Sequence, residues 1–220
     1  MRAFVPKVPL GPLISMEDVI AKTIETYEKI APYYEKEHID PDFWLKKFQL
    51  FQKLLKGKKV VEIGCGFGRD AELFVKNNFD YVGIDASKNM LKIAHKRVPK
   101  GKFLQMNFYN LDFPEETFDG FWAVASLLHV PKTDIAGILK SISKLVKHNG
   151  AGFITVKEKR DVEEGVIKQQ RYFGSIERYF AFYTKDEFQG LLEKTGFKII
   201  DFSVRKAAGD VWLCFFVKKA

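Results

Sequence analysis

A glycine-rich segment carries the residue types that most directly suggest chemistry. The segment reads Glu62-Ile63-Gly64-Cys65-Gly66-Phe67-Gly68-Arg69. It directly follows an apolar run at 59–63 that predicts a buried strand, and it precedes a helix expected at 71–77. Glycines let the backbone turn sharply and approach a ligand closely, because they have no Cβ. The free N–H groups at the start of the helix would add hydrogen-bond donors for that ligand.

Asp85 is the second residue of interest. It follows a predicted strand at 81–84 and lies about 20 residues after Gly64, which is the separation typical of nucleotide-binding α/β units. Neighbouring parallel strands end at the same edge of a sheet, so Asp85 is expected beside the glycine loop. One carboxylate can accept hydrogen bonds from both hydroxyl groups of a ribose. The loop and the acid together predict a site for an adenosine-containing cofactor.

The spacing of the glycines disfavours two common nucleotide sites. The dinucleotide fingerprint is G-x-G-x-x-G, but here the third glycine comes one position early and Arg69 takes its place. A phosphate-binding P-loop requires a lysine, which this loop lacks. The remaining pattern, E-x-G-x-G-x-G after one strand and an acid after the next, resembles the first two motifs of class I S-adenosylmethionine-dependent methyltransferases. The resemblance covers residues 27–218 and is strongest to the branch that acts on small molecules.

The resemblance implies which residues bind the cofactor. Gly64 and Gly66 would run beside its methionine portion, and Asp85 would hold its ribose. Asn107 stands where the family usually has an acid that receives the adenine amino group, and its carbonyl oxygen can accept the same proton. Arg69 could pair with the methionine carboxylate. The full expected set is Tyr27, Glu62, Gly64, Cys65, Gly66, Gly68, Arg69, Asp85, Ala86, Ser87, Met90, Asn107, Phe108, Ala123 and Ser126.

Two residues are candidates for catalysis. Methyl transfer from a sulfonium centre needs mainly alignment, so a dedicated base is optional. His129 ends the run 122–129, which resembles the family's fourth motif, and its imidazole could act as a base. It could equally pack beside Pro131 or cap the next helix. Glu158, just past a strand expected at 151–156, could orient an acceptor or pair with a surface lysine.

A charged and aromatic segment at 157–181 suggests where the methyl acceptor binds. It includes Arg178 and Phe180, and such a mixture suits an anionic or aromatic small molecule, although an exposed segment at the sheet edge would look similar. Tyr27 and Tyr34 belong to the front helices, which the resemblance implies cover the cofactor. The expected substrate-binding residues are Tyr34, Arg178, Phe180, Tyr183 and Trp212.

The elements that position these residues alternate along the chain. Strands are expected at 59–63, 81–84, 102–106, 118–125, 151–156, 198–204 and 211–217, with helices at 71–77, 87–97 and 133–146. Thr184 and Glu187 predict a capping box for a further helix that ends before Gly196. The last two strands should form a hairpin around Gly209. These elements predict a doubly wound, Rossmann-like α/β fold with a mainly parallel seven-stranded sheet and a C-terminal antiparallel hairpin.

The prediction also covers the N-terminal segment and the limits of the domain that follows it. Residues 1–56 are expected to form an arm and lid helices, one of which should end or kink at Pro32, while a second spans 42–55. Residues 57–220 would form the S-adenosylmethionine-binding domain, as one structural unit with the front. The charged and aromatic residues of the segment 157–181 recur at no clear period, so the segment is expected to run irregularly over the edge of the sheet.

Composition narrows the class of protein. The 220 residues have 46% hydrophobic content and lack a long apolar run, so one soluble, cytoplasmic domain is expected. Cys65 and Cys214 have no flanking ligands, which indicates neither a metal site nor a disulfide. The net charge of +8 is compatible with a nucleic-acid partner, but the lysines are scattered as on an ordinary solvated surface.

The preferred function is methyl transfer to a small molecule, and three alternatives stay open. The positive charge favours an RNA- or tRNA-directed methyltransferase, yet residues 123–126 read Ala-Val-Ala-Ser rather than the Asn/Asp-Pro-Pro-Tyr/Phe of base-methylating members. A non-catalytic protein that keeps the fold is disfavoured by the intact glycine loop and Asp85. A nicotinamide-dependent oxidoreductase is disfavoured by the loop spacing.

Overall fold

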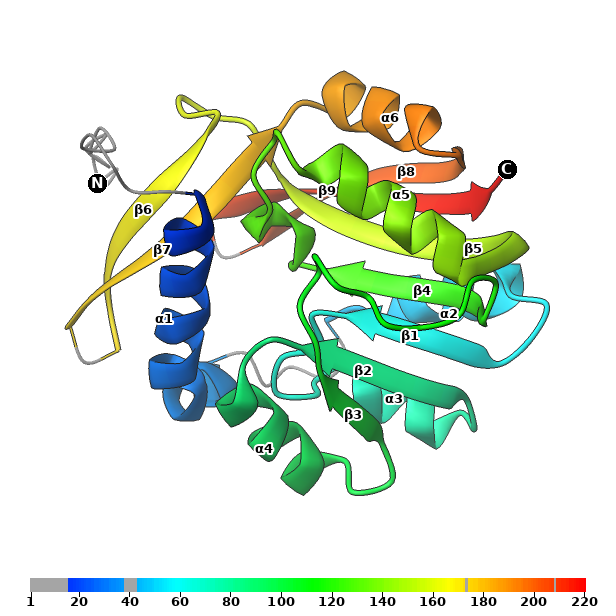
Figure 1. Ribbon diagram of the computed structural model, residues 1–220, viewed down its shortest axis with the longest axis horizontal. Coiled ribbons are helices and arrows are strands. Elements are labelled where there is room, and N and C mark those ends of the chain that lie inside the picture. Colours follow the sequence, from blue (N-terminus) through cyan, green and yellow to red (C-terminus); the bar gives the residue numbers. More distant parts are fainter. Residues whose placement is uncertain (1–15, 38–42, 173, 208) are drawn as a thin grey trace.

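The computed structural model describes residues 16–37, 43–172, 174–207 and 209–220 (Figure 1). The first fifteen residues of the expected arm and the start of the helix expected at 42–55 lie outside the described residues. Within the described part of the chain, none of the helices combines the length and apolarity needed to cross a bilayer.

Five parallel strands form the centre of the molecule in the order β3-β2-β1-β4-β5 (Figure 1). Their bounds are β1 Lys59–Ile63, β2 Asp80–Asp85, β3 Lys102–Gln105, β4 Phe118–Val124 and β5 Val146–Glu158. These strands were all predicted, and β1 begins and ends at the predicted residues. Since β2 and β4 lie on opposite sides of β1, the loops after β1 and β4 diverge, and a cleft opens at their carboxyl ends.

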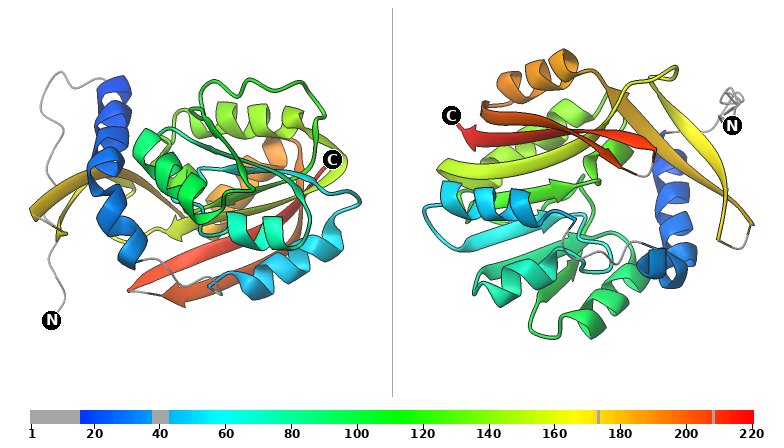
Figure 2. Two further views of the ribbon diagram at one scale, coloured as in Figure 1. Left: turned by 90° about the horizontal axis from the view of Figure 1, so that it is seen from below. Right: turned by 180° about the vertical axis from the view of Figure 1, so that it is seen from behind.

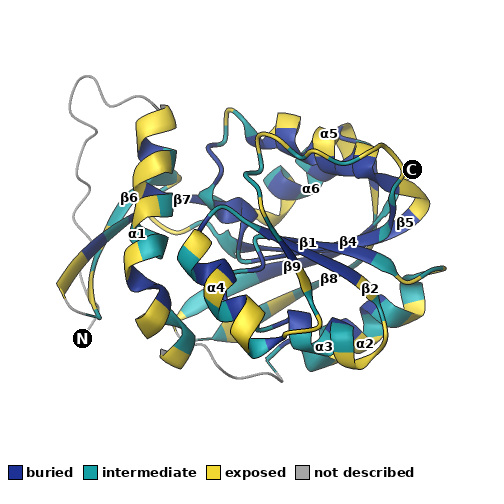
Figure 3. Ribbon diagram, turned by 60° about the horizontal axis from the view of Figure 1, so that its bottom comes forward, coloured by how far each residue is buried: buried dark blue, intermediate teal, exposed yellow. Residues whose placement is uncertain are grey.

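Helices cover both faces of this sheet, as a doubly wound fold requires (Figure 3). Helices α5 Ile135–Leu145 and α6 Lys185–Lys194 pack on one face. The other face carries α2 Leu45–Leu54, α3 Ala71–Lys76 and α4 Lys88–Arg97. The predicted capping box of α6 is confirmed, because the side chains of Thr184 and Glu187 each accept the other's backbone N–H.

The C-terminal hairpin is confirmed, but the sheet formed by the described residues has nine strands rather than the predicted seven. Strand β9 Asp210–Lys219 pairs antiparallel with both β5 and β8 Phe197–Ala207. The two additional strands are β6 Glu164–Arg171 and β7 Gly174–Tyr183, an antiparallel hairpin where an irregular segment was expected. Strand β7 joins the sheet only at the end of β5, and the rest of the hairpin projects beyond it (Figure 2).

Strand β7 escaped detection because most of its residues are buried on both faces. Its consecutive residues Tyr179, Phe180 and Ala181 are all buried. Helix α1 Met16–Glu37 packs along one side of the hairpin (Figure 2). A strand covered on both faces shows no alternation of polar and apolar residues, which is the signal that sequence analysis depends on.

Helix α1 continues through Pro32 to Glu37, so of the two predicted effects of Pro32, an end or a kink of the helix, the end is wrong. Proline lacks the N–H that would donate to the carbonyl four residues earlier, which belongs to Glu28. That carbonyl oxygen instead accepts from the Asn89 side chain at 3.0 Å. The Glu28 carboxylate also accepts from the backbone N–H groups of Lys88 (2.5 Å) and Asn89 (3.0 Å) at the start of α4. Tertiary contacts therefore satisfy the group that proline leaves unpaired.

Candidate functional site

The glycine loop is held against the end of β2 by its own backbone. The N–H groups of Gly64 and Cys65 both donate to the Ile84 carbonyl, at 2.8 and 2.9 Å. Gly64, Gly66 and Gly68 have φ angles of +76°, +54° and +80°, a left-handed conformation that favours glycine. A Cβ on Gly64 would lie 2.4 Å from the Cβ of Ser126, so the loops after β1 and β4 touch at this point.

Asp85 lies beside the loop, as the topology predicted. Its Oδ2 accepts from the Gly66 N–H and its Oδ1 accepts from the Ser87 N–H, both at 2.8 Å. Burial raises the pKa of Asp85 to about 6, although these two N–H groups act in the opposite direction. Each carboxylate oxygen keeps acceptor capacity for a ligand. Asp85 therefore fixes the shape of the loop and also presents a negative charge to the space in front of it.

A second group of polar side chains supports the loop from behind. The Glu62 carboxylate accepts from the Tyr81 hydroxyl at 2.5 Å. Burial, and then the charge of nearby Asp70, raise the pKa of Glu62 well above its usual range. Asp70 accepts from the indole N–H of Trp122 at 2.9 Å and from two nitrogens of Arg69 at 2.6 and 3.0 Å.

Arg69 is therefore already paired with its neighbour in the chain. Burial acts to lower the pKa of Arg69, but the charge of Asp70 and its hydrogen bonds to Arg69, together with weaker contributions from Tyr34 and Glu62, raise the pKa overall. An ion pair between Arg69 and the methionine carboxylate of the cofactor would therefore have to form in addition to the two hydrogen bonds with Asp70, or replace them.

Two adjoining pockets open at the carboxyl ends of the strands. The first lies over the glycine loop and the end of β2 and is closed on one side by α1. Most of the residues expected to bind the cofactor line it. They are Tyr27, Glu62, Gly64, Cys65, Gly66, Arg69, Asp85, Ala86, Ser87, Met90, Asn107, Phe108 and Ser126.

Two expected residues lie away from this lining. The Gly68 backbone packs against α4, where an added Cβ would lie 3.1 Å from the Cβ of Ala94. Ala123 is fully buried in β4 and belongs to the hydrophobic core.

The first pocket also contains residues that sequence analysis did not assign to it. Ile20 and Ile24 of α1 looked like ordinary core positions at helical spacing, and only the placement of α1 across the strand ends reveals them. Tyr109 follows Asn107 by two residues and donates its backbone N–H to the Asn107 side chain at 3.0 Å. Ala125 has a φ angle of +53° that no sequence signal marks. The complete additional set is Ile20, Thr23, Ile24, Phe67, Asp70, Tyr109, Val124 and Ala125.

The second pocket lies between the end of β5, the β6–β7 hairpin, β9 and the front of the chain. It contains Tyr34, Arg178, Phe180 and Trp212, four of the five residues expected to bind the acceptor. It shares a wall with the first pocket. The residues common to both linings are Tyr27, Tyr34, Arg69, Ala125 and His129.

Two of the residues predicted for catalysis or acceptor binding line neither pocket. Tyr183 is fully buried and packs edge-on against Phe188, with 4.9 Å between ring centroids. Glu158 lies beside it at the end of β5, paired with Tyr183 in the sheet register. Glu158 was chosen because it follows a predicted strand, whereas Tyr183 was chosen as one of several aromatic and cationic residues, before strand β7 was known.

His129 belongs to a hydrogen-bonded chain within the shared wall. Its Nδ1 lies 2.6 Å from the Tyr179 carbonyl oxygen, which can only accept, so Nδ1 carries the proton. Its Nε2 therefore accepts from the Tyr27 hydroxyl at 2.8 Å. Arg178 donates to the same hydroxyl at 2.9 Å. Burial, reinforced by the charges of Arg178 and Lys157, lowers the pKa of His129 to about 3, so the imidazole is neutral at neutral pH.

Sequence comparisons find that part of the chain is similar to methyltransferases. A family model described as a methyltransferase domain matches residues 60–150. The ubiquinone biosynthesis O-methyltransferase of Pelagibacter ubique is 34% identical over 143 residues, which cover 63% of this chain and 57% of that protein. The ubiquinone/menaquinone biosynthesis C-methyltransferase UbiE of Campylobacter jejuni is 27% identical over 219 residues, covering 82% of this chain and 91% of that protein. The chain spans less than two thirds of the first of these relatives.

Solved structures show the same fold at low sequence identity. The 1,6-didemethyltoxoflavin-N1-methyltransferase of Burkholderia thailandensis, crystallised with 1,6-didemethyltoxoflavin and S-adenosylhomocysteine, superposes with a TM-score of 0.75 at 19% identity. That match covers 95% of this chain and 92% of the other. An S-adenosylmethionine-dependent methyltransferase from Methanosarcina mazei gives a TM-score of 0.70 at 19% identity, covering 77% and 96%.

Proposed function

We propose that this chain, a class I S-adenosylmethionine-dependent methyltransferase by its domain and its fold, transfers a methyl group from S-adenosylmethionine to a small-molecule acceptor. The observation that carries the proposal is the pair of adjoining pockets with a common wall. One pocket contains the glycine loop and Asp85, and the other contains cations and aromatic rings. Two ligands held there would meet at the common wall, as a transfer reaction requires.

The first pocket has the groups that the cofactor needs. Asp85 keeps acceptor capacity for the two ribose hydroxyls, and a Cβ added to Gly66 would meet no atom within 4 Å, so the backbone there faces open space. The hydroxyl of Ser126 is buried and has no hydrogen-bond partner in the described part of the chain. The Asn107 side chain would receive the adenine amino group, and Gly64 would lie beside the methionine portion. When bound, S-adenosylmethionine supplies a methyl group on a positively charged sulfur.

Helix α1 and the common wall would orient the reactants and exclude water. Ile20, Ile24 and Tyr27 of α1 cover the first pocket with mainly apolar surface, and Tyr27 also belongs to the common wall. Because Tyr27 donates to Nε2 of His129 and accepts from Arg178, each ring holds the other in one orientation. With both nitrogens of His129 engaged and its pKa low, we assign His129 a positioning role toward Tyr27 rather than that of a free base.

The affinity for S-adenosylhomocysteine is expected to fall as the pH drops below 6. The ribose hydroxyls need the ionised form of Asp85, whose pKa is raised by burial from 3.8 to about 6 in the folded protein. At pH 5 only about a tenth of Asp85 is ionised, so the dissociation constant should rise about tenfold relative to pH 7.5. Calorimetric titrations at several pH values measure this change, and an affinity of Asp85→Asn that is independent of pH over the same range is the control.

The stability of the ligand-free protein should respond to Asp85 in the opposite sense. The folded state binds the proton more tightly than the unfolded chain, because the folded pKa is the higher one. The contribution of Asp85 to stability is therefore fully present below pH 3.8 and is lost as the pH rises through about 6. A decrease in S-adenosylhomocysteine affinity that merely followed acid unfolding would accompany lower stability and would contradict this assignment.

Two measurements test the proposed function itself. Calorimetry should show binding of S-adenosylmethionine and S-adenosylhomocysteine but not of NAD. Methyl-labelled S-adenosylmethionine, incubated with the protein and a metabolite extract, should then place label in a small molecule that chromatography separates from the labelled S-adenosylmethionine itself. Binding of NAD alone, or of none of the three, would refute the cofactor assignment. Label retained on RNA would refute the small-molecule acceptor.

A further inference from the structure

The second pocket contains a buried cation that lacks a carboxylate partner. Arg178 is only 5% exposed. Its terminal nitrogens donate to the Tyr27 hydroxyl at 2.9 Å and to the Gln169 side chain at 2.5 Å, both of which are neutral partners. Its Nε is buried without any hydrogen-bond partner, and none of the acidic side chains in the described ranges forms an ion pair with it. Burying a charge without a counter-charge is costly, so this arrangement requires an explanation.

The neighbouring cations differ from Arg178 in this respect. Arg69 pairs with Asp70, and Lys157 pairs with Asp210 at 2.8 Å. Arg160 also lies 3.4 Å from the carboxylate of Asp210. Among the described residues that line the second pocket, Asp210 is the one acid, whereas the cations are Arg69, Lys157, Arg160, Arg171 and Arg178. The pocket therefore has excess positive charge, and Arg178 is more buried than Arg69, Lys157 or Arg160.

Aromatic rings surround this charge. The Arg178 guanidinium lies 5.2 Å from the centroid of the Phe180 ring, and the Lys157 ammonium lies 4.7 Å from the same centroid. Lys157 also lies 5.4 Å from the Trp212 ring, while His129 packs against Phe180 at 4.8 Å. Flat apolar surfaces next to fixed cations suit a planar ring that carries a negative charge.

We infer that the second pocket binds the methyl acceptor as an aromatic carboxylate whose charge is paired with Arg178. The Nε–H of arginine and a neighbouring terminal N–H form the fork that matches a carboxylate, and the Nε–H of Arg178 is the donor without a partner. The ring of the acceptor would lie among Phe180, Trp212 and Tyr34. The inference rests on the proposed function, since it names the class of molecule that the second pocket receives.

The test compares acids with their neutral amides. Protein saturated with S-adenosylhomocysteine is titrated with benzoate, salicylate and 4-hydroxybenzoate, and with the amide of each. At least one acid is expected to bind about tenfold more tightly than its amide, which is a modest value for a buried charged hydrogen bond. In Arg178→Met this preference should disappear, and in Arg178→Lys, which keeps the charge but loses the fork, it should be intermediate.

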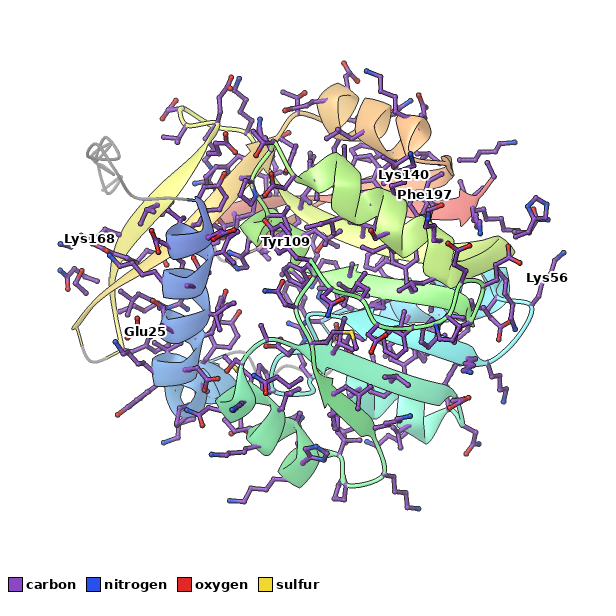
Figure 4. All side chains as sticks on the ribbon, in the orientation of Figure 1. Glu25, Lys56, Tyr109, Lys140, Lys168 and Phe197 are labelled. Atoms are coloured by element: carbon purple, nitrogen blue, oxygen red, sulfur yellow. The ribbon has the colours of Figure 1, made fainter. Side chains whose placement is uncertain are left out.

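A matched control removes the same charge at another place. Lys168 is exposed on β6 and points away from the sheet (Figure 4). Lys168→Met should keep the preference for acids. Arg178→Met should unfold at the same or a higher temperature than the unmodified protein without ligand, because it removes an unpaired buried charge. A lower unfolding temperature together with an unchanged preference for acids would make Arg178 a structural residue and overturn the inference.

The remaining outcomes separate this inference from the proposed function. If S-adenosylhomocysteine binds but every acid binds no better than its amide, the aromatic carboxylate is wrong and the methyltransferase assignment stands. A preference that survives in Arg178→Met also overturns the inference. If S-adenosylhomocysteine does not bind at all, the proposed function fails, and the same titrations without it still decide whether the second pocket selects anions.

Discussion

Replacing Asp85 by alanine is expected to raise the dissociation constant for S-adenosylhomocysteine at least 100-fold. Each hydrogen bond between a ribose hydroxyl and a charged carboxylate contributes about 1.5–3 kcal/mol, so the loss of two gives at least about a 100-fold decrease in affinity. The substitution also releases the N–H groups of Gly66 and Ser87, to which Asp85 is bonded at 2.8 Å. The loop then loses the shape that receives the ligand.

Calorimetry on the purified variant measures this loss directly. Asp85→Asn keeps the size of the side chain and one acceptor oxygen, so it separates the effect of the charge from that of the volume. Asp80→Ala, at the exposed first position of the same strand, is the control and should bind normally. An Asp85→Ala variant with less than a fivefold decrease in affinity would show that the ribose is held elsewhere.

Alanine substitutions at Gly64 and Gly66 are expected to separate stability from binding. At Gly64 the φ angle is +76° and the new Cβ would lie 2.4 Å from the Ser126 Cβ. Left-handed strain and overpacking together should lower the free energy of unfolding by about 2–4 kcal/mol. At Gly66 the φ angle is +54°, but no atom lies within 4 Å of the new Cβ. There the free energy of unfolding should fall by only about 1 kcal/mol.

Both substitutions should weaken S-adenosylhomocysteine binding by at least about tenfold, because each alters a backbone position that approaches the ligand closely. Thermal unfolding without ligand should show a decrease of roughly 5–12 °C for Gly64→Ala and a few degrees for Gly66→Ala. Gly137, on the surface of α5 with no atom near an added Cβ, is the control: Gly137→Ala should keep the affinity and should leave the stability unchanged or slightly higher, because alanine favours a helix more than glycine does. Equal stabilities for the Gly64 and Gly66 variants would contradict the close contact with Ser126.

The first pocket, which would bind the cofactor, could be predicted because the residues that indicate it lie close together in the sequence. The strand at 59–63, the glycine loop and Asp85 follow one another closely, and parallel topology brings their ends together without further information. The structure places Gly66 and Asp85 in direct contact, as that reasoning required. The motif therefore predicted both the fold class and the geometry of the first pocket.

The second pocket, which would bind the methyl acceptor, depends on contacts between segments that are distant in the sequence, and sequence patterns do not reveal such contacts. Tyr27 of α1, His129 after β4 and Arg178 of β7 form one hydrogen-bonded chain, but they are separated by roughly a hundred and fifty residues and no motif connects them. Strand β7 was missed because its burial on both sides hides the alternation of a strand. The continuation of α1 through Pro32 depends on Asn89, a partner in another helix.

Helix α1 is bonded both to helix α4, which contributes to the first pocket, and to strand β7, which contributes to the second. Glu28 binds the start of α4, while Thr26 donates to the Glu177 carbonyl of β7 at 2.8 Å and Thr23 accepts from the Tyr179 N–H at 3.0 Å. Ligands in the two pockets therefore contact the same helix. If one ligand orders helix α1, the second ligand binds with a smaller loss of conformational entropy in that helix. The resulting cooperativity is reciprocal: the factor by which S-adenosylhomocysteine increases acceptor affinity equals the factor by which the acceptor increases that of S-adenosylhomocysteine.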